Sequence, residues 1–184
     1  MSERRNEITA LATQAVQRSG LHSVSFRQLA DEIGIKSSSV HYHFKTKSDL
    51  AEALISEYTE NFSLKLQEIE ATNDTLLGQL DDLIGVFEFV TKEQNLCLCG
   101  MMATELTELD EPTKKSLRNF FSVTESWLSS AFSRHKDEVK VALSPEQLSQ
   151  VFVSTLEGAM LLDRADEDGK RLEAAHALAR AFVR

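Results

Sequence analysis

Between Arg27 and Lys47 the sequence gathers side chains that can hydrogen-bond to an anion. They carry hydroxyl, imidazole, phenol, guanidinium or ammonium groups, and they are Arg27, Ser37, Ser38, Ser39, His41, Tyr42, His43 and Lys47. Short polar side chains such as serine can reach base edges in a DNA groove, whereas Arg, Lys, His and Tyr can hold phosphates. The cluster therefore favours binding to nucleic acid. A solvated polar face of a small helix pair is the alternative.

The charge of the chain is distributed in agreement with this interpretation. Residues 1–47 carry seven Lys or Arg and four acidic residues, a balance of +3, whereas the other 137 residues carry 13 and 25, a balance of −12. Segments that differ in sign often differ in partner, so the N-terminal part is expected to meet an anion. An accident of surface composition is the alternative explanation of the charge.

Composition narrows the class of protein. No apolar run approaches the roughly 18 residues that cross a bilayer, and the N-terminal "MSERRNEI" lacks a signal peptide, so we expect a cytoplasmic protein without a membrane partner. Two nearby cysteines do not suggest a disulfide framework. With only seven Gly and two Pro, the chain has few helix breakers, and long helices are expected.

Three helices are expected around the polar cluster. Apolar residues at helical spacing predict a first helix that ends at Gly20. Ser25 and Gln28 match a Ser-x-x-Gln capping box that would begin a second helix, and Gly34 would end it. A third helix is expected from about Ser37 to His43. Two helices joined by a glycine turn form a helix-turn-helix, in which Gly34 is expected to let the helices cross closely.

The rest of the chain also reads as helical. Thr46 can cap a fourth helix, and Asn73 or Asp74 is expected to begin a fifth. Ser144 begins a later helix with a Ser-x-x-Gln box and Pro145 at its first position. About nine helices and no convincing strand predict an all-α fold.

The stretch "SFRQLADEIGIKSSSVHYHFKTKSDL", from Ser25 to Leu50, resembles the DNA-binding signature of TetR-type (TetR/AcrR) transcriptional regulators. The similar features are Ile33-Gly34-Ile35, the segment His41-Tyr42-His43-Phe44, and Lys47, and they cover about the first 60 residues. His41 departs from the family, which usually has a phosphate-binding Tyr there. Histidine donates more strongly when protonated, so DNA affinity is expected to weaken as pH rises.

The resemblance implies a fold and a function. It implies an N-terminal three-helix helix-turn-helix DNA-binding domain over residues 1–47 and a helical ligand-sensing and dimerisation domain over residues 48–184. It also implies a dimeric repressor that binds a near-palindromic operator in double-stranded DNA. The homodimer would pair the last two long helices, about Pro145–Arg164 and Gly169–Val183. Their apolar stripes fit a buried intramolecular core equally well.

The resemblance further implies a small-molecule ligand among the middle helices. Aromatic and Met side chains line adaptable apolar pockets. The candidates are Phe62, Leu83, Phe87, Met101, Met102, Phe120, Phe121 and Trp127. Each of them could instead be an ordinary core residue. Their number favours an apolar or aromatic ligand.

Cys97 and Cys99 lie where "NLCLCG" interrupts the helical pattern, before a helix expected over "MMATELTEL". A thiol at a helix N-terminus is more often a reactive thiolate, so the pair could sense oxidants or electrophiles, as some TetR-like repressors do. Two buried, unreactive cysteines are the alternative. Their spacing matches no common zinc site, and we predict no metal and no cofactor.

Other functional classes are less well supported by the sequence. It contains no Gly-rich phosphate loop, nucleophile elbow or His-Glu-x-x-His motif, so we predict that the chain is not an enzyme. Adjacent acids such as Asp81-Asp82 diverge on a helix and are better explained as surface residues. The remaining alternative is a helical protein-interaction module without specific DNA binding.

Overall fold

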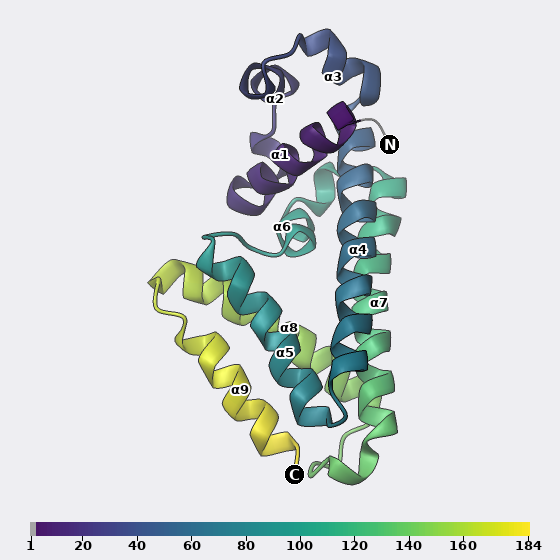
Figure 1. Cartoon of the computed structure of the whole chain (residues 1–184), viewed down its shortest axis with the longest axis vertical. Helices are drawn as coiled ribbons and strands as arrows, with labels where there is room; N and C mark the ends of the chain where they lie inside the picture. Colours follow the sequence, from purple (N-terminus) through teal and green to yellow (C-terminus); the bar gives the residue numbers. More distant parts are fainter. Residues whose placement is uncertain (1–2) are drawn as a thin grey trace. The chain divides into compact units, whose positions relative to one another are not determined.

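The chain folds almost entirely into helices. The computed structural model describes residues 3–184, within which nine α-helices and three short 3-10 helices are found (Figure 1). The α-helices are α1 (Glu3–Ser19), α2 (Phe26–Ile33), α3 (Ser37–His43), α4 (Lys47–Thr72), α5 (Leu76–Lys92), α6 (Leu98–Thr104), α7 (Glu111–Arg134), α8 (Pro145–Asp166) and α9 (Lys170–Phe182). The 3-10 helices are η1 (Leu21–Ser23), η2 (Leu106–Glu108) and η3 (Lys136–Glu138). The predicted all-α fold of about nine helices is confirmed.

Two compact units make up the described chain. Unit 1 contains residues 3–60 and 98–120, and unit 2 contains residues 61–97 and 121–184. The long helices α4 and α7 each begin in unit 1 and end in unit 2. Within residues 3–184, no helix combines the length and the apolar character needed to span a bilayer.

In unit 1, α1 packs against α2 and α6. Its residues Ile8, Ala12 and Val16 recur at helical spacing and are fully buried, as the apolar pattern predicts. Arg5 ties the same helix to α4, because its guanidinium pairs with the carboxylate of Glu57. The guanidinium also lies 5.3 Å from the centre of the Phe44 ring, within the range of a cation–π contact.

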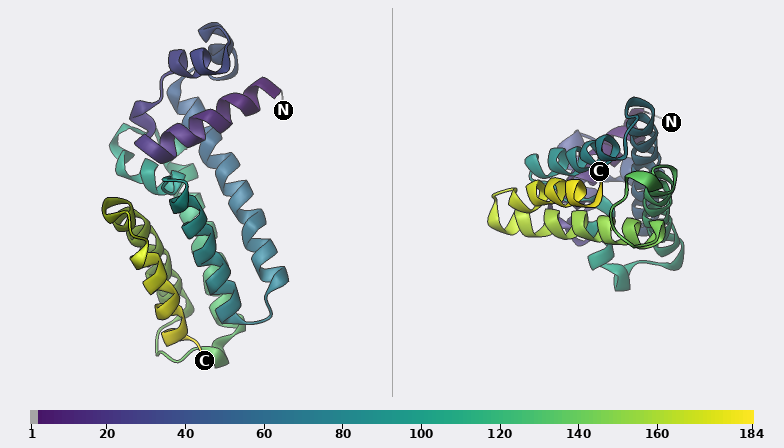
Figure 2. Two further views of the ribbon diagram at one scale, coloured as in Figure 1. Left: turned by 60° about the vertical axis from the view of Figure 1, so that its left-hand side comes forward. Right: turned by 90° about the horizontal axis from the view of Figure 1, so that it is seen from below.

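In unit 2, α5, α8 and α9 pack against one another, as Figures 1 and 2 show. Buried Asp163 of α8 fixes the start of α9, because its carboxylate accepts hydrogen bonds from the backbone N–H groups of Arg171 (3.0 Å) and Leu172 (2.9 Å). These donors lie in the first turn of α9, where no carbonyl of that helix can pair with them. The contact holds α8 and α9 as an antiparallel pair.

Two of the expected helix starts are confirmed. Thr46 and Asp49 exchange side-chain and backbone hydrogen bonds of 2.9 and 3.1 Å at the start of α4. Ser144 and Gln147 form the expected capping box at the start of α8, with a proline following Ser144.

Two other expectations are wrong. Ser25 precedes α2, but its side chain caps no N–H there, because a Ser-x-x-Gln pattern does not fix the rotamer. Thr75, rather than Asn73 or Asp74, caps α5 by accepting from the N–H of Gly78. Asn73 instead donates to the carbonyl of Ile69 at the end of α4 and to the carboxylate of Asp82.

Candidate nucleic-acid interface

The turn between α2 and α3 sets the angle of the polar cluster. Gly34 has a left-handed backbone (φ 76°, ψ 33°), and the N–H of Ile35 donates to the carbonyl of Ala30 at 2.9 Å. A Cβ at Gly34 would meet no atom within 4 Å. The expectation that this glycine permits close helix crossing is therefore wrong. Glycine is needed because of its positive φ, which strains other residues.

Helix α3 has one buried side and one exposed side. Val40 is fully buried, and Phe44 is buried at the end of the helix. Ser38, Ser39, His41 and Tyr42 are exposed, whereas Ser37 and His43 are half-buried. A seven-residue helix held by so few apolar residues depends on its packing against α2, because an isolated helix of this length is unstable. That packing presents the exposed side chains on one surface.

Tyr42 is the most conspicuous member of this surface, because it is 83% exposed. Its ring meets the ring of His43 edge to face at 5.2 Å. An aromatic ring left in water gives up most of the free energy that its burial would provide, about 1.5–3 kcal/mol for a side chain of this size. Tyr is enriched at interfaces because its ring is apolar and its hydroxyl can hydrogen-bond, so this exposed ring favours a surface that is covered on binding.

The ring of His41 contacts an aromatic residue outside the polar cluster. Its ring lies 4.9 Å from the ring of Phe26, with the two planes at 65°. Phe26 is the first residue of α2 and is half-buried. The contact restrains the imidazole while leaving it exposed.

The two cations flanking the helix pair have different environments. The side chain of Arg27 is 87% exposed, and its Nε lies 4.0 Å from the carboxylate of Asp31 one turn later. Lys47 is half-buried and its Nζ donates to the backbone carbonyl of His22 at 3.1 Å. The carboxylate of Asp49 lies in the same first turn of α4, so a phosphate there would meet a negative charge as well as the positive helix end.

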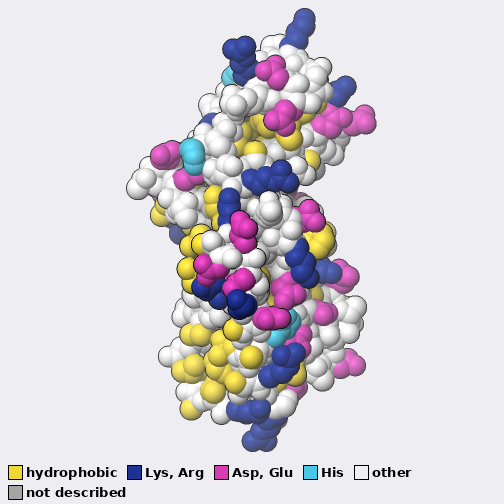
Figure 3. All heavy atoms as spheres, turned by 90° about the vertical axis from the view of Figure 1, so that its left-hand side faces the viewer, with side chains coloured by type: hydrophobic (Ala, Val, Ile, Leu, Met, Phe, Trp, Pro, Cys, Tyr) yellow, Lys and Arg dark blue, Asp and Glu magenta, His cyan; other side chains and the backbone are white. Residues whose placement is uncertain are grey.

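All eight predicted DNA-binding residues thus lie in unit 1, at the start of α2, along α3 and at the start of α4. In Figure 3, Lys and Arg side chains project from the part of unit 1 that contains α2 and α3. The arrangement combines exposed short hydroxyls with flanking cations, which is the chemistry needed to contact base edges and phosphates.

The predicted ligand-lining residues are divided between the two units. Phe62, Leu83, Phe87, Phe121 and Trp127 belong to unit 2, whereas Met101, Met102 and Phe120 belong to unit 1. In unit 2 the rings of Phe62 and Phe87 meet edge to face with centroids 6.4 Å apart. In unit 1 Phe120 lies 5.5 Å from the ring of Tyr58.

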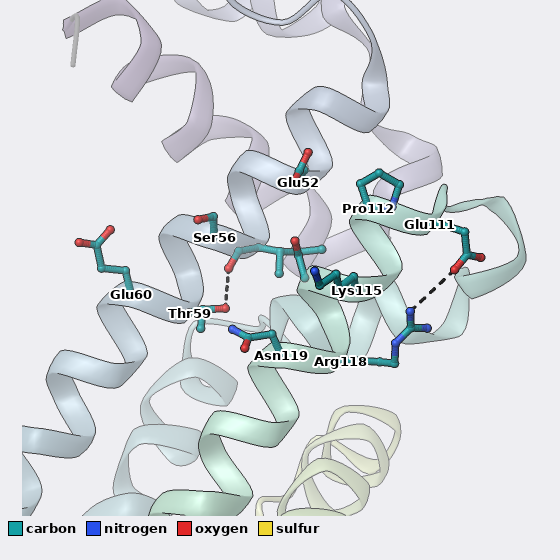
Figure 4. Close-up of a pocket in the computed structure, with 11 residues that line it drawn as sticks. Glu52, Ser56, Thr59, Glu60, Glu111, Pro112, Lys115, Arg118 and Asn119 are labelled. Carbon is teal, nitrogen blue, oxygen red and sulfur yellow. Dashed lines mark hydrogen bonds and ion pairs between the residues drawn. The ribbon is translucent and has the colours of Figure 1, made fainter.

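An open groove of about 860 Å³ does occur in unit 1, between the first parts of α4 and α7 (Figure 4). None of the predicted ligand-lining residues borders it. Lys115 and Asn119 of α7 point toward α4 (Figure 4). Glu111 is already paired with Lys114 at 2.9 Å and with Arg118 at 3.7 Å, and these pairs hold the pKa of its carboxyl below the usual range. Most of the lining residues are polar or charged, and Ile55 and Pro112 are the apolar ones.

Both cysteines are buried and neither forms a disulfide, with exposed fractions of 3% for Cys97 and 0% for Cys99. Cys97 immediately precedes α6 and Cys99 lies in its first turn. In unit 2 the thiol of Cys97 hydrogen-bonds to the carboxyl of Glu157, whose pKa is raised because burial disfavours the charged form. Sequence alone gave no signal for this partner. Across residues 3–184, no group of three or more His, Cys, Asp or Glu side chains is arranged to hold a metal ion.

Two family models match the chain. Residues 8–54 match the model described as bacterial regulatory proteins, tetR family. Residues 82–178, more than half of the chain, match the C-terminal domain model of LmrA/YxaF-like transcriptional regulators.

Relatives and solved structures agree with these matches. The HTH-type transcriptional repressor KstR2 of Mycolicibacterium smegmatis is 31% identical over 86 residues, which span 47% of this chain and only 40% of that protein. A TetR transcriptional regulator from Legionella pneumophila has 26% identity and a TM-score of 0.91, covering 100% of this chain and 99% of its own. A TetR-family regulator from Agrobacterium tumefaciens has 26% identity and a TM-score of 0.92, covering 97% of each chain. The chain therefore belongs to the TetR family of bacterial regulatory proteins, and it is a DNA-binding transcription regulator rather than an enzyme.

Proposed function

We propose that the protein is a homodimeric repressor that binds a near-palindromic operator through α3 and its flanking cations. The observation that carries this proposal is the exposure of Tyr42, which stands beside exposed Ser38, Ser39 and His41 on one surface. Ser37, Ser38 and Ser39 would reach base edges in the major groove. Arg27, His41, Tyr42, His43 and Lys47 would hold the phosphates on either side. Residues 1–47 would then supply the DNA contacts, and residues 48–184 the sensing and dimerisation.

The α8–α9 pair of unit 2 supports the proposed homodimer. Val151, Leu161 and Leu162 of α8 are exposed, and a Cβ at Gly158 on the same helix would meet no atom within 4 Å. Exposed alanines add a small-residue stripe on α9, namely Ala174, Ala177 and Ala181. Apolar side chains gather over the lower part of the face shown in Figure 3, where α8 and α9 lie.

A second copy of the chain is the occupant that these two helices would fit. A contiguous exposed apolar surface on two adjacent helices is typical of an interface, and a two-fold arrangement would bury the same surface on both subunits. The same two-fold symmetry would place two α3 helices on two half-sites of the operator.

A small apolar ligand would release the operator, and unit 2 offers one feature to receive it. The indole N–H of Trp127 is buried and has no acceptor among the described residues. An unpaired buried donor costs about 1–3 kcal/mol, which a ligand oxygen near the indole would recover. The preferred ligand is therefore apolar with at least one acceptor oxygen. The aromatic pair Phe62 and Phe87 lies in the same unit and would supply apolar contacts.

Cysteine modification is the other proposed trigger. Cys97 is the better supported of the two thiols, because a change at its sulfur would remove the hydrogen bond that it makes to Glu157 of α8. Since α8 is one of the two proposed dimer helices, a disturbance there would reach the pairing of the subunits. Cys99 has no exposed surface and lies in unit 1.

The test is selection of DNA by the purified protein from a random-sequence duplex pool. Fluorescence anisotropy would then compare the selected duplex with a scrambled one across a salt series. We expect a near-palindrome with half-sites about one helical turn apart, bound at least about 10³-fold more tightly than the scrambled duplex, with a steep loss of affinity as salt rises. Equal, weak binding to both duplexes with a shallow salt slope would instead favour the interaction module.

The trigger is tested by repeating the measurement with thiols reduced and after treatment with hydrogen peroxide. Loss of binding only in the oxidised wild type, and not in Cys97→Ser, would support the cysteine trigger. Unchanged binding in both states would reject it and leave the apolar ligand.

A further inference from the structure

The turn that follows α1 is held by a glutamate from a distant part of the sequence. The backbone N–H of His22 donates to Oε2 of Glu105 at 2.9 Å, and Nδ1 of the His22 ring lies 2.9 Å from Oε1 of the same carboxylate. The Glu105 side chain is only 12% exposed, whereas that of His22 is 67% exposed. A carboxylate that meets both a backbone N–H and a ring nitrogen of one residue fixes the position of that residue firmly.

The backbone beside His22 is shaped to admit this carboxylate. Gly20 has a φ of +84°, and a Cβ placed on it would lie 2.1 Å from Oε1 of Glu105. Ser23 closes the turn by donating from its hydroxyl to the carbonyl of Gly20 at 2.8 Å. Glycine is favoured here by its positive φ, and a Cβ at this position would displace the Glu105 carboxylate from the turn.

The carbonyl of His22 holds the ammonium of Lys47. Nζ of Lys47 donates to this carbonyl at 3.1 Å. An ammonium has three donors, so two remain for a phosphate. The hydrogen bond also restrains a group that would otherwise move freely on a four-carbon stem. Glu105, His22 and Lys47 thus form a continuous series of contacts within unit 1 that ends at a proposed DNA contact.

We propose that Glu105 is a positioning residue for DNA binding. It fixes His22, and His22 in turn fixes the ammonium of Lys47 toward the operator backbone. This inference rests on the proposed phosphate contact of Lys47. Without the Glu105 carboxylate the His22 N–H loses its acceptor and the turn is freed. The ammonium is then no longer held toward the phosphate, so the contact and the counterion that it releases are lost and the affinity falls.

Four proteins test the inference on the selected operator: the wild type, Glu105→Ala, Glu105→Gln and the control Glu108→Ala. Glutamine keeps an oxygen acceptor for the His22 N–H but removes the charge. Glu108 is an exposed residue of η2, so its replacement removes the same charge nearby. We expect Glu105→Ala to weaken binding roughly tenfold and to lower the salt slope by about 1. Glu105→Gln and Glu108→Ala should stay within about twofold of the wild type.

A double-mutant cycle with Lys47→Gln separates the outcomes. If Glu105 acts through Lys47, the combined variant binds no more weakly than Lys47→Gln alone. Additive losses, or an unchanged salt slope in Glu105→Ala, would overturn the inference, because a loss of folded protein lowers the active concentration without changing the slope. If Lys47→Gln itself leaves affinity unchanged, the proposed phosphate contact fails and the inference fails with it. Specific operator binding by the other residues would then still stand.

Discussion

The ring of His41 stands edge to face against the ring of Phe26, with centroids 4.9 Å apart and planes at 65°. Phe26 begins α2 and His41 lies in α3, so the contact joins the two helices of the helix-turn-helix. Edge-to-face aromatic pairs contribute about 0.5–1.5 kcal/mol beyond their burial. The contact also holds the imidazole on the exposed surface where a phosphate is proposed to bind.

The pH dependence of operator binding tests the role of the His41 ring. Operator affinity is expected to be lower at about pH 8 than at about pH 6. The reason is that the protonated ring donates more strongly to a phosphate. Anisotropy at constant ionic strength measures the change. His41→Tyr keeps a donor at this position without titrating in the range, so its affinity should be nearly constant. If the pH dependence persists unchanged in His41→Tyr, it comes from His22 or His43 and not from His41.

Substitutions of Tyr42 and Val40, which both lie in α3, should affect operator binding and the stability of the fold separately. Tyr42→Ala is expected to weaken operator binding at least tenfold with little change in the free energy of unfolding, because the ring is 83% exposed. Val40 is fully buried, so Val40→Ala should lose roughly 1–3 kcal/mol of stability. Urea unfolding and anisotropy on both variants provide the measurements. A large loss of stability in Tyr42→Ala would show that the ring supports the fold.

Several helices could be predicted from the sequence because the signals that mark them are local. Apolar spacing in α1 and the capping pair at Ser144 involve residues a few positions apart, and the structure contains both. The mistakes have local causes as well. The pattern at Ser25 names a capping residue without fixing its rotamer, and Gly34 was assigned a steric role when its backbone conformation is what requires glycine.

The contacts of the site that could not be predicted join residues that are far apart in the sequence. Glu105 meets His22 across 83 positions, and Cys97 meets Glu157. The spacing of apolar residues shows which face of a helix is apolar but not which other helix that face contacts. Neither pair could therefore be predicted from the sequence. The groove between α4 and α7 was missed for the same reason, because its lining residues come from two distant segments.

A matched pair of leucines tests the proposed dimer. Leu161 of α8 and Leu64 of α4 are similarly exposed, at 55% and 59%. Leu161→Glu is expected to give a monomer by sedimentation velocity and to weaken operator binding by more than tenfold, because a buried unpaired charge is strongly unfavourable at an interface. Leu64→Glu introduces the same charge away from α8 and α9, and should leave both properties unchanged. A dimer that persists in Leu161→Glu would exclude this face as the interface.

Glu157 predicts a pH dependence of stability that involves Cys97. Burial raises the pKa of its carboxyl above the ordinary value of 4.5, and the hydrogen bond from the Cys97 thiol opposes this only in part. The native state therefore favours the neutral acid. The contribution of Glu157 to stability is present below its unfolded pKa and is lost as pH rises through the folded pKa. Glu157→Gln, which stays neutral, should be more stable than the wild type at about pH 8, and the difference should shrink toward pH 4.5.

Urea unfolding at several pH values measures this difference, with Glu173→Gln as the control because Glu173 is exposed on α9. Cys97→Ala removes the thiol donor and should steepen the loss of stability at high pH, because the charged carboxylate then has one hydrogen bond fewer. The double variant Cys97→Ala with Glu157→Gln should lose the extra pH dependence. If Glu157→Gln is less stable than the wild type at every pH, the carboxylate is satisfied in the native state.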